Sequence, residues 1–320
     1  MQIVTVPLSI LIVLSFLICS SPVLFAHTFS ENENALFLTM INKIKAETQL
    51  VAQNFSNNTK QAQDHASVAL ALFTQKDPVV NTTWTAEISE RNPRVTTDLL
   101  HYLNDLKTTT ASSASNANSV STVQSKVANI GNLLDEAVSV RISKDLLDSP
   151  KTQALVLANL GNEIYSNYGN ALGLPPSTVA NMAGMSMPSK PSMNMNTSSG
   201  NGMSGMDAMS ESTAKDPSPA TIKNLTAYQT AQSLAAVAQQ VFENNLKPIA
   251  PTNATNSNSN IANYLNQLKN AVNNKSPFMN VMEVVHVKLH PTLISAYNLR
   301  LSMPGMSMPS KGSSMNMNKH

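Results

Sequence analysis

Apolar residues recur at every third or fourth position along most of this chain. A long example runs through Val123, Val127, Ile130, Leu134 and Val138. This spacing places the apolar side chains on one face of an α-helix, whereas a half-buried strand needs them at every second position. An apolar helix face is stable in water when it packs against another such face. The pattern therefore predicts an all-α fold made of helical bundles.

The predicted helices fall into two groups. The first group starts with a capping box at Ser30 and Glu33 and predicts a helical bundle over residues 27–174. The second group starts near Pro219 and predicts a shorter helical unit over residues 218–301.

Each predicted unit is followed by a segment rich in Met, Ser, Asn, Gly and Pro. These residues favour turns and cannot bury enough apolar surface to order a core of their own. We therefore expect a disordered tether over residues 175–217 and a Met-rich C-terminal tail over residues 302–320.

The two Met-rich segments contain the same motif, M-x-G-M-S-M-P-S-K-x-S-M-N-M-N, with one serine inserted in the second copy. The first Met module spans residues 182–196 and the second Met module spans residues 303–318. Most of the 17 methionines lie in or beside the two modules. The module methionines are Met182, Met185, Met187, Met193 and Met195 in the first copy, and Met303, Met306, Met308, Met315 and Met317 in the second.

Methionine usually fills gaps in a core, but the module methionines stand among residues that cannot form one. The thioether sulfur is neutral and soft, so clustered thioethers select Cu(I) or Ag(I) over Zn²⁺, Mg²⁺ or Ca²⁺. The M-x-M spacing places two sulfurs on one side of an extended segment, and the glycine lets the chain bend to bring a third within reach. The repeat therefore predicts copper as the bound cofactor. Two other interpretations stay open: a linker with a methionine bias, and a sacrificial sink for oxidants.

The Met modules resemble the Met-rich segments of exported copper- and silver-binding proteins, which scavenge or hand over Cu(I). The resemblance covers the two modules and none of the predicted helices. It implies an extracytoplasmic metal carrier or buffer, and it carries over only to the module methionines. The scaffold departs from that group, whose members are often small β-barrels or short disordered chains.

The N-terminal segment has the pattern of an export signal, with an apolar run over residues 3–18 and a small residue, Ala26, at a cleavage position. We predict a signal peptide over residues 1–26, with retention of the segment as a membrane anchor as the alternative. The single cysteine, Cys19, lies inside this segment, so the mature chain has no thiolate ligands. An extracytoplasmic location follows, where thiols oxidise and Met and His handle copper.

Four histidines are candidate ligands. Cleavage after Ala26 gives His27 a terminal amine beside its imidazole, a chelating pair for Cu(II). This pairing resembles the histidine brace of copper monooxygenases and the N-terminal site of exported copper-resistance proteins, a resemblance that covers one residue. His320 adjoins the second Met module and can add an imidazole to a thioether site. The other two candidates are His286 and His290.

His286 and His290 are four residues apart. On a helix they lie one turn apart and can share a metal ion, whereas on a strand they stand roughly 13 Å apart. The local alternation of apolar residues favours a strand, and the all-helical context favours a helix that ends at Pro291. His65 and His101 lie on predicted helices without a local partner, so we interpret them as packing or surface residues.

Composition excludes several function classes. Charged residues make up 12% of the chain, the formal net charge is +2, and no basic stripe occurs, so nucleic acid is not expected as a partner. No glycine-rich phosphate loop, G-x-S-x-G elbow or H-E-x-x-H motif supports a nucleotide enzyme or hydrolase. Sequons for N-glycosylation occur at Asn54, Asn57, Asn81, Asn196, Asn224, Asn253 and Asn274.

These features predict a non-enzymatic extracytoplasmic protein that buffers or delivers copper. Its expected partners are the metal ion and an exported copper enzyme or transporter, with a membrane contact only if the N-terminal segment is retained. One alternative is an accessory or catalytic subunit of an exported copper enzyme that uses His27 and the pair His286 and His290. Another is a structural glycoprotein of the cell envelope whose Met-rich tails act as antioxidants.

Overall fold

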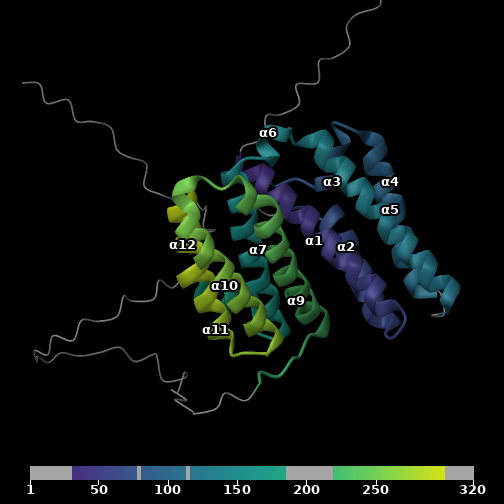
Figure 1. Ribbon diagram of the computed structural model, residues 1–320. Coiled ribbons are helices and arrows are strands. Elements are labelled where there is room, and N and C mark those ends of the chain that lie inside the picture. Colours follow the sequence, from purple (N-terminus) through teal and green to yellow (C-terminus); the bar gives the residue numbers. More distant parts are fainter. Residues whose placement is uncertain (1–30, 78–80, 113–115, 185–218, 300–320) are drawn as a thin grey trace, which may run out of the picture.

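The computed structural model describes residues 31–77, 81–112, 116–184 and 219–299. In these ranges the regular elements are helices, and β-type pairing is limited to a single bridge between Lys76 and Thr83. The predicted all-α fold is therefore confirmed for the described part of the chain (Figure 1).

The described helices before residue 185 are α1 (Glu31–Phe55), α2 (Thr59–Thr74), α3 (Trp84–Ser89), α4 (Pro93–Ser112), α5 (Ala117–Arg141), α6 (Lys144–Leu147), α7 (Pro150–Ala171) and α8 (Pro176–Gly184). Those after residue 218 are α9 (Leu225–Gln240), the π-helical η3 (Val241–Leu246), the 3₁₀ turns η4 (Lys247–Ile249) and η5 (Thr252–Ala254), α10 (Thr255–Asn273), α11 (Phe278–Met282), the π-helical η6 (Glu283–Leu289) and α12 (His290–Tyr297).

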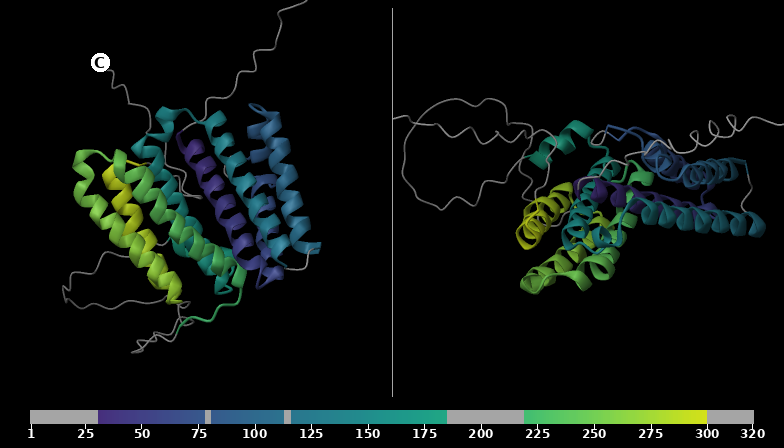
Figure 2. Two further views of the ribbon diagram at one scale, coloured as in Figure 1. Left: turned by 45° about the vertical axis from the view of Figure 1, so that its right-hand side comes forward. Right: turned by 90° about the horizontal axis from the view of Figure 1, so that it is seen from above.

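The long helices lie side by side, with α1 near the middle (Figure 2). Helix α1 packs against α2, α5, α7 and α9. Helices α4 and α5 form one edge of the molecule, and α10 and α12 form the opposite edge (Figure 2). Helices from both halves of the chain therefore pack against α1.

The two halves of the chain share one hydrophobic core, so the prediction of two separate helical units is not confirmed. Buried residues from both halves belong to a single cluster, and α7 packs along α9. The backbone N–H of Lys223 donates to Ala171 O at 2.8 Å, which fixes the start of α9 to the end of α7. Helix α7 has a run of consecutive buried residues from Thr152 to Ala158, so it is covered on all sides.

Helix α8 occupies the first residues of the predicted tether. Its Val179 lies so close to α7 that a Cβ added to Gly169 would come within 2.6 Å of the valine side chain. The hydroxyl of Tyr165, on α7, also donates to Val179 O at 2.9 Å. This tertiary contact orders residues whose composition alone indicates a linker. The remaining predicted tether, residues 185–217, and the predicted tail at 302–320 lie outside the described residues.

The C-terminal helix continues past Pro291, where we predicted its end. Helix α11 passes into the π-helical η6 and then into α12 without a break. Pro291 is the second residue of α12, directly after the π-helical η6, and it has no backbone N–H to donate to the turn before it. The proline therefore falls where the hydrogen bonding changes from π-helical to α-helical, inside a continuous helix. The helical alternative for His286 and His290 is confirmed.

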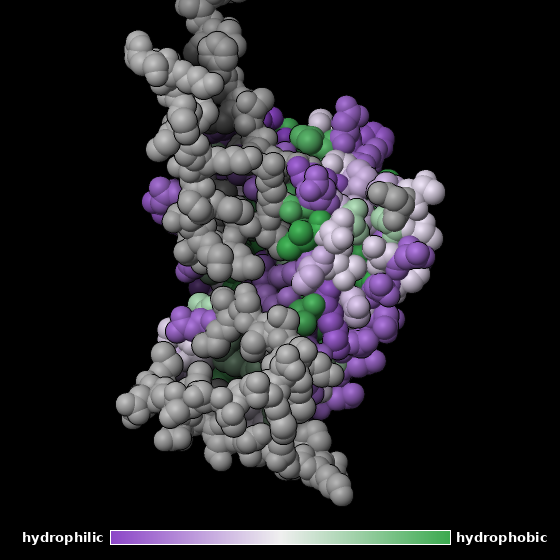
Figure 3. Space-filling model, turned by 90° about the vertical axis from the view of Figure 1, so that its left-hand side faces the viewer, coloured by the Kyte–Doolittle hydropathy of each residue, from purple (hydrophilic) through white to green (hydrophobic). Residues whose placement is uncertain are grey.

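A few large apolar side chains of the C-terminal helices face solvent. Met279, Val287 and Ile294 are 42%, 43% and 36% exposed. Figure 3 shows the side of the molecule on which α10 to α12 lie, where hydrophobic residues are interspersed among hydrophilic ones. Single exposed apolar side chains of this kind are normal on the surface of a folded protein and need no special explanation.

Candidate functional site

His286 and His290 lie together at the junction of η6 and α12. Their rings meet edge to face, with ring centroids 5.1 Å apart and an interplanar angle of 85°. η6 is a π-helical segment, a rare geometry that often marks functional sites. The structure thus brings this predicted pair together.

His290 is almost completely buried against α7. Its Nε2 atom lies 3.0 Å from Ala158 O, and because a carbonyl only accepts, this nitrogen carries the proton. Burial, with a smaller effect of His286, lowers the pKa of His290 to about 4, so the ring is neutral at pH 7. The lone pair is then on Nδ1. Gly161 makes room for the ring, since a Cβ there would lie 3.3 Å from Nε2.

His286 is partly buried between two aromatic neighbours. Its ring meets Tyr165 edge to face at a centroid distance of 4.7 Å, in addition to its contact with His290. Burial lowers the pKa of His286, which also favours the neutral ring. Within the described part of the chain, Nε2 of His286 is shielded from solvent and has no hydrogen-bond partner. A buried ring nitrogen without a partner is unusual in a packed interior.

Tyr165 connects this pair to α8. Its ring packs against Phe278 at a centroid distance of 4.7 Å, and its hydroxyl bonds to Val179 O. Burial raises the pKa of Tyr165 to about 12, so the hydroxyl stays protonated and remains a donor. Met182 is three residues beyond Val179 and therefore lies on the same face of α8. It is partly buried against the core.

Apart from Met182, His286 and His290, the predicted ligands lie outside the described residues. They are His27, His320, the four remaining methionines of the first Met module and the five of the second. In the described ranges, no group of three or more His, Cys, Asp and Glu side chains is placed to hold a metal ion. Met182, His286 and His290 are thus the predicted ligands that the structure places.

A second polar cluster was not predicted. Glu47 and His65 are fully buried, and Nδ1 of His65 lies 2.6 Å from Glu47 Oε2. The other carboxylate oxygen, Oε1, accepts from the Thr230 hydroxyl at 2.7 Å. The cluster joins α1, α2 and α9. Glu47 falls between the apolar Ile44 and Val51 in the sequence, and a carboxylate on an apolar helix face is the signal that could have revealed it.

Amide side chains extend the hydrogen bonds of this cluster. The Asn54 amide nitrogen donates to Leu50 O, so its oxygen faces the Gln229 amide nitrogen, 3.1 Å away. The oxygen of Gln229 must then be the atom 2.9 Å from Nε2 of His65. The amide nitrogen of Gln61 also lies 3.4 Å from Nε2 of His65, so this ring nitrogen has two amide neighbours. The carboxylate and the imidazole are thus enclosed by hydrogen-bonding side chains, and the role of the cluster is structural.

Buried Arg141 is a further charged group in the core. Its guanidinium lies over the Phe37 ring at 4.2 Å and near the Trp84 ring at 5.3 Å. Glu87 is 3.6 Å away. Burial lowers the pKa of Arg141 to about 10, which leaves it charged at neutral pH. Stacking on aromatic faces suits a guanidinium, so this residue stabilises the packing of α1, α3 and α5.

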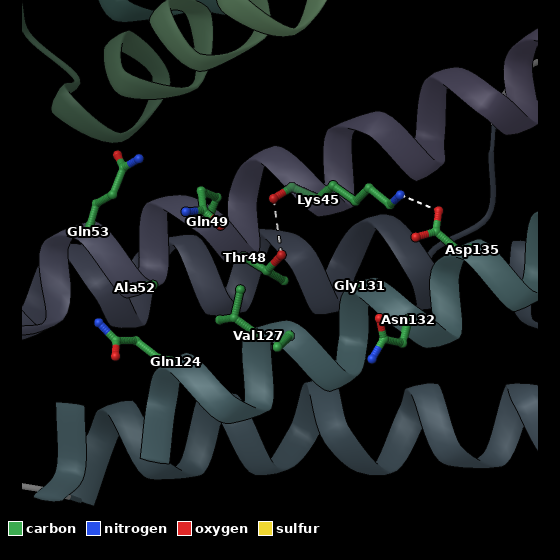
Figure 4. A pocket seen from close by; sticks show the side chains of 11 residues that line it. Lys45, Thr48, Gln49, Ala52, Gln53, Gln124, Val127, Gly131, Asn132 and Asp135 are labelled. Carbon is green, nitrogen blue, oxygen red and sulfur yellow. Dashed lines mark hydrogen bonds and ion pairs between the residues drawn. The ribbon is translucent and has the colours of Figure 1, made fainter. Parts of the chain in front are cut away.

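An open groove of about 660 Å³ runs between α1 and α5 (Figure 4). Amide side chains and small apolar residues form its walls, and the ion pair of Lys45 with Asp135, at 2.5 Å, lies at one end (Figure 4). Gln49, Gln53, Gln124 and Asn132 supply the amides. The groove contains none of the predicted metal ligands.

Comparisons with known proteins found no relative of this chain. No protein-family model, curated protein or solved structure matches it. None of the described helices is long and apolar enough to cross a membrane. The function of this protein must therefore be inferred from its own residues.

Proposed function

We propose that this protein binds Cu(I), and equally the soft ion Ag(I), outside the cytoplasm through its two Met modules. The repeat of the motif, in which the spacing of the methionines recurs along with the composition, is the observation that carries the proposal. Thioethers bind soft monovalent ions without first losing a proton. The single cysteine, Cys19, lies in the predicted signal peptide, so a thiolate site is not an alternative in the mature chain.

The position of the modules along the chain supports this role. The first Met module begins in α8, which packs on α7, and the second begins shortly after α12. Both modules thus adjoin helices of the common core. The helical body acts as a scaffold, and the protein buffers copper or delivers it to an exported copper enzyme or transporter.

Metal titration of the purified mature protein tests the proposal. We expect binding of more than one Cu(I) or Ag(I) per chain and a clear preference over Zn²⁺. Replacement of Met185, Met187, Met193 and Met195 by leucine is expected to remove about half of the Cu(I) capacity, because one of two equivalent modules is lost. The helix content measured by circular dichroism should stay unchanged.

A matched control is available in Met279. It is an exposed methionine of α11 outside both modules. Met279→Leu should therefore leave the Cu(I) capacity unchanged. Equal uptake of Zn²⁺ and Cu(I), or a capacity that does not depend on either module, would contradict the proposal.

A further inference from the structure

The two histidines at the junction of η6 and α12 have the features of metal ligands. Nε2 of His290 donates its proton to Ala158 O, and Nε2 of His286 is shielded from solvent without a hydrogen-bond partner in the described ranges. Histidines that bind metals usually donate their other ring N–H to such a carbonyl, which fixes the ring and the tautomer. Nδ1 of His290 and Nε2 of His286 are then the available lone pairs.

The surroundings of the pair select a monovalent ion. In the described part of the chain no carboxylate or third histidine joins them, so nothing there offsets the charge of a divalent ion. The cost of placing an ion in a poorly solvated site rises with the square of its charge. A structural Zn²⁺ site also needs four ligands. Cu(I) accepts few neutral, soft or borderline ligands, and the pair satisfies this requirement.

The separation of the two rings favours a bent site that a third ligand completes. Two imidazoles bound in a straight line, with metal–nitrogen bonds of about 2.0 Å, have ring centres roughly 6 Å apart. The present separation is 5.1 Å, so an ion shared by the two rings would be held in a bent arrangement. Tyr165 contacts both His286 and the backbone of α8 at Val179, so it connects the pair to α8. Met182 lies on the face of α8 that carries Val179.

We propose that His286, His290 and the thioether of Met182 form an interior Cu(I) site, which the first Met module supplies. This inference rests on the proposed function, because Met182 is the first methionine of that module. It adds a site of mixed nitrogen and sulfur ligands, held by the folded core, to the thioether sites of the modules. Such a site holds Cu(I) more firmly than the modules, because the folded chain positions its ligands before binding.

The test uses a full-length variant in which every methionine at 185–209 and 303–317 is leucine, with Met182 retained. We expect this variant to keep a single Cu(I) site. X-ray absorption of the Cu(I) complex should show both nitrogen and sulfur ligands. His286→Phe in this background should abolish the site, while the phenyl ring preserves the contact with Tyr165. Because His286 makes no hydrogen bond within the described residues, its replacement is not expected to unfold the chain.

Further variants separate the ligands from the fold. Met182→Leu should weaken Cu(I) binding at least tenfold and remove sulfur from the absorption spectrum. His101→Gln, a change of an exposed histidine on α4, should have no effect. Circular dichroism confirms that each variant is folded.

The outcomes distinguish this inference from the proposed function. If the wild-type protein binds Cu(I) and the methionine-depleted variant does not, the interior site is disproved while the function of the modules stands. If the depleted variant binds Cu(I) and His286→Phe changes nothing, the site is also disproved. If the wild-type protein binds no Cu(I), the proposed function fails as well.

Discussion

Two histidines of this chain have opposite environments. His65 is enclosed by polar side chains, with Nδ1 2.6 Å from a carboxylate oxygen of Glu47, whereas His290 is buried among apolar groups and bonds to a single backbone carbonyl. One backbone carbonyl does not offset the cost of burying a charge, so burial keeps the His290 ring neutral at pH 7. The two histidines therefore contribute to stability in different ways.

Removal of the buried carboxylate should be costly. Glu47→Gln disrupts the buried contacts of the carboxylate with His65 and Thr230, so we expect a loss of about 3 kcal/mol in the free energy of unfolding. Asp64→Asn is the matched control, because Asp64 pairs with Lys60 on the surface of α2, and it should change the free energy by less than about 0.5 kcal/mol. Urea unfolding at pH 7 measures both. An equal effect of the two substitutions would show that the buried cluster is not a source of stability.

Acid should destabilise the metal-free protein through His290. The pKa of this residue falls from 6.5 to about 4 on folding, so between these values the unfolded chain binds a proton that the folded chain does not. The stabilisation is complete above pH 6.5 and is lost as the pH falls towards 4. The loss is about 3 kcal/mol. Urea unfolding at pH 7.5 and pH 4.5, with a chelator present, should show a smaller decrease for His290→Gln than for the wild type.

At the scale of elements, α8 depends on a close contact with α7. Gly169→Ala would bring a methyl group within 2.6 Å of the Val179 side chain and 3.1 Å of the Phe278 ring. We expect a loss of about 1–3 kcal/mol in stability, because both neighbours must shift. Gly131→Ala on α5 is the control, since nothing lies within 4 Å of its added methyl group. It should stabilise the protein by about 0.5–1 kcal/mol through the lower entropy of the unfolded chain. Chemical unfolding of the two variants should thus give changes of opposite sign.

The C-terminal helix shows how an element can differ from its local pattern. The alternation of Val285, Val287 and Leu289 is typical of a strand, and Pro291 is typical of a helix end. The chain instead forms a continuous helix, because η6 packs between α7 and α10 and the π-helical turn shifts the hydrogen bonds ahead of the proline. Strand and proline signals are local, and here the tertiary contacts outweigh them.

At the scale of the whole molecule, the shared core couples the two halves of the chain. Without α9, α1 and α7 would expose the apolar faces that now cover Ala231, Leu234 and Ala238, all nearly or fully buried. We therefore expect residues 27–184 and residues 218–320, when expressed as separate chains, to associate and copurify. Each alone should have low helix content or aggregate. If each fragment folds and unfolds cooperatively by itself, the two helical units predicted from the sequence are independent and the shared core is not required for folding.

The sequence alone determined the helical nature of this protein and the chemistry of its Met modules. Helix formation follows from a spacing that repeats over a few residues, and the softness of a thioether does not depend on the fold. The halves, however, are joined by contacts between residues far apart in the chain, such as Glu47 with Thr230 and Lys223 with Ala171. Periodicity shows that a face is buried but not which helix covers it. For this reason only the tertiary structure could decide that the two predicted units share a core, that α8 is ordered and that the rings of His286 and His290 meet.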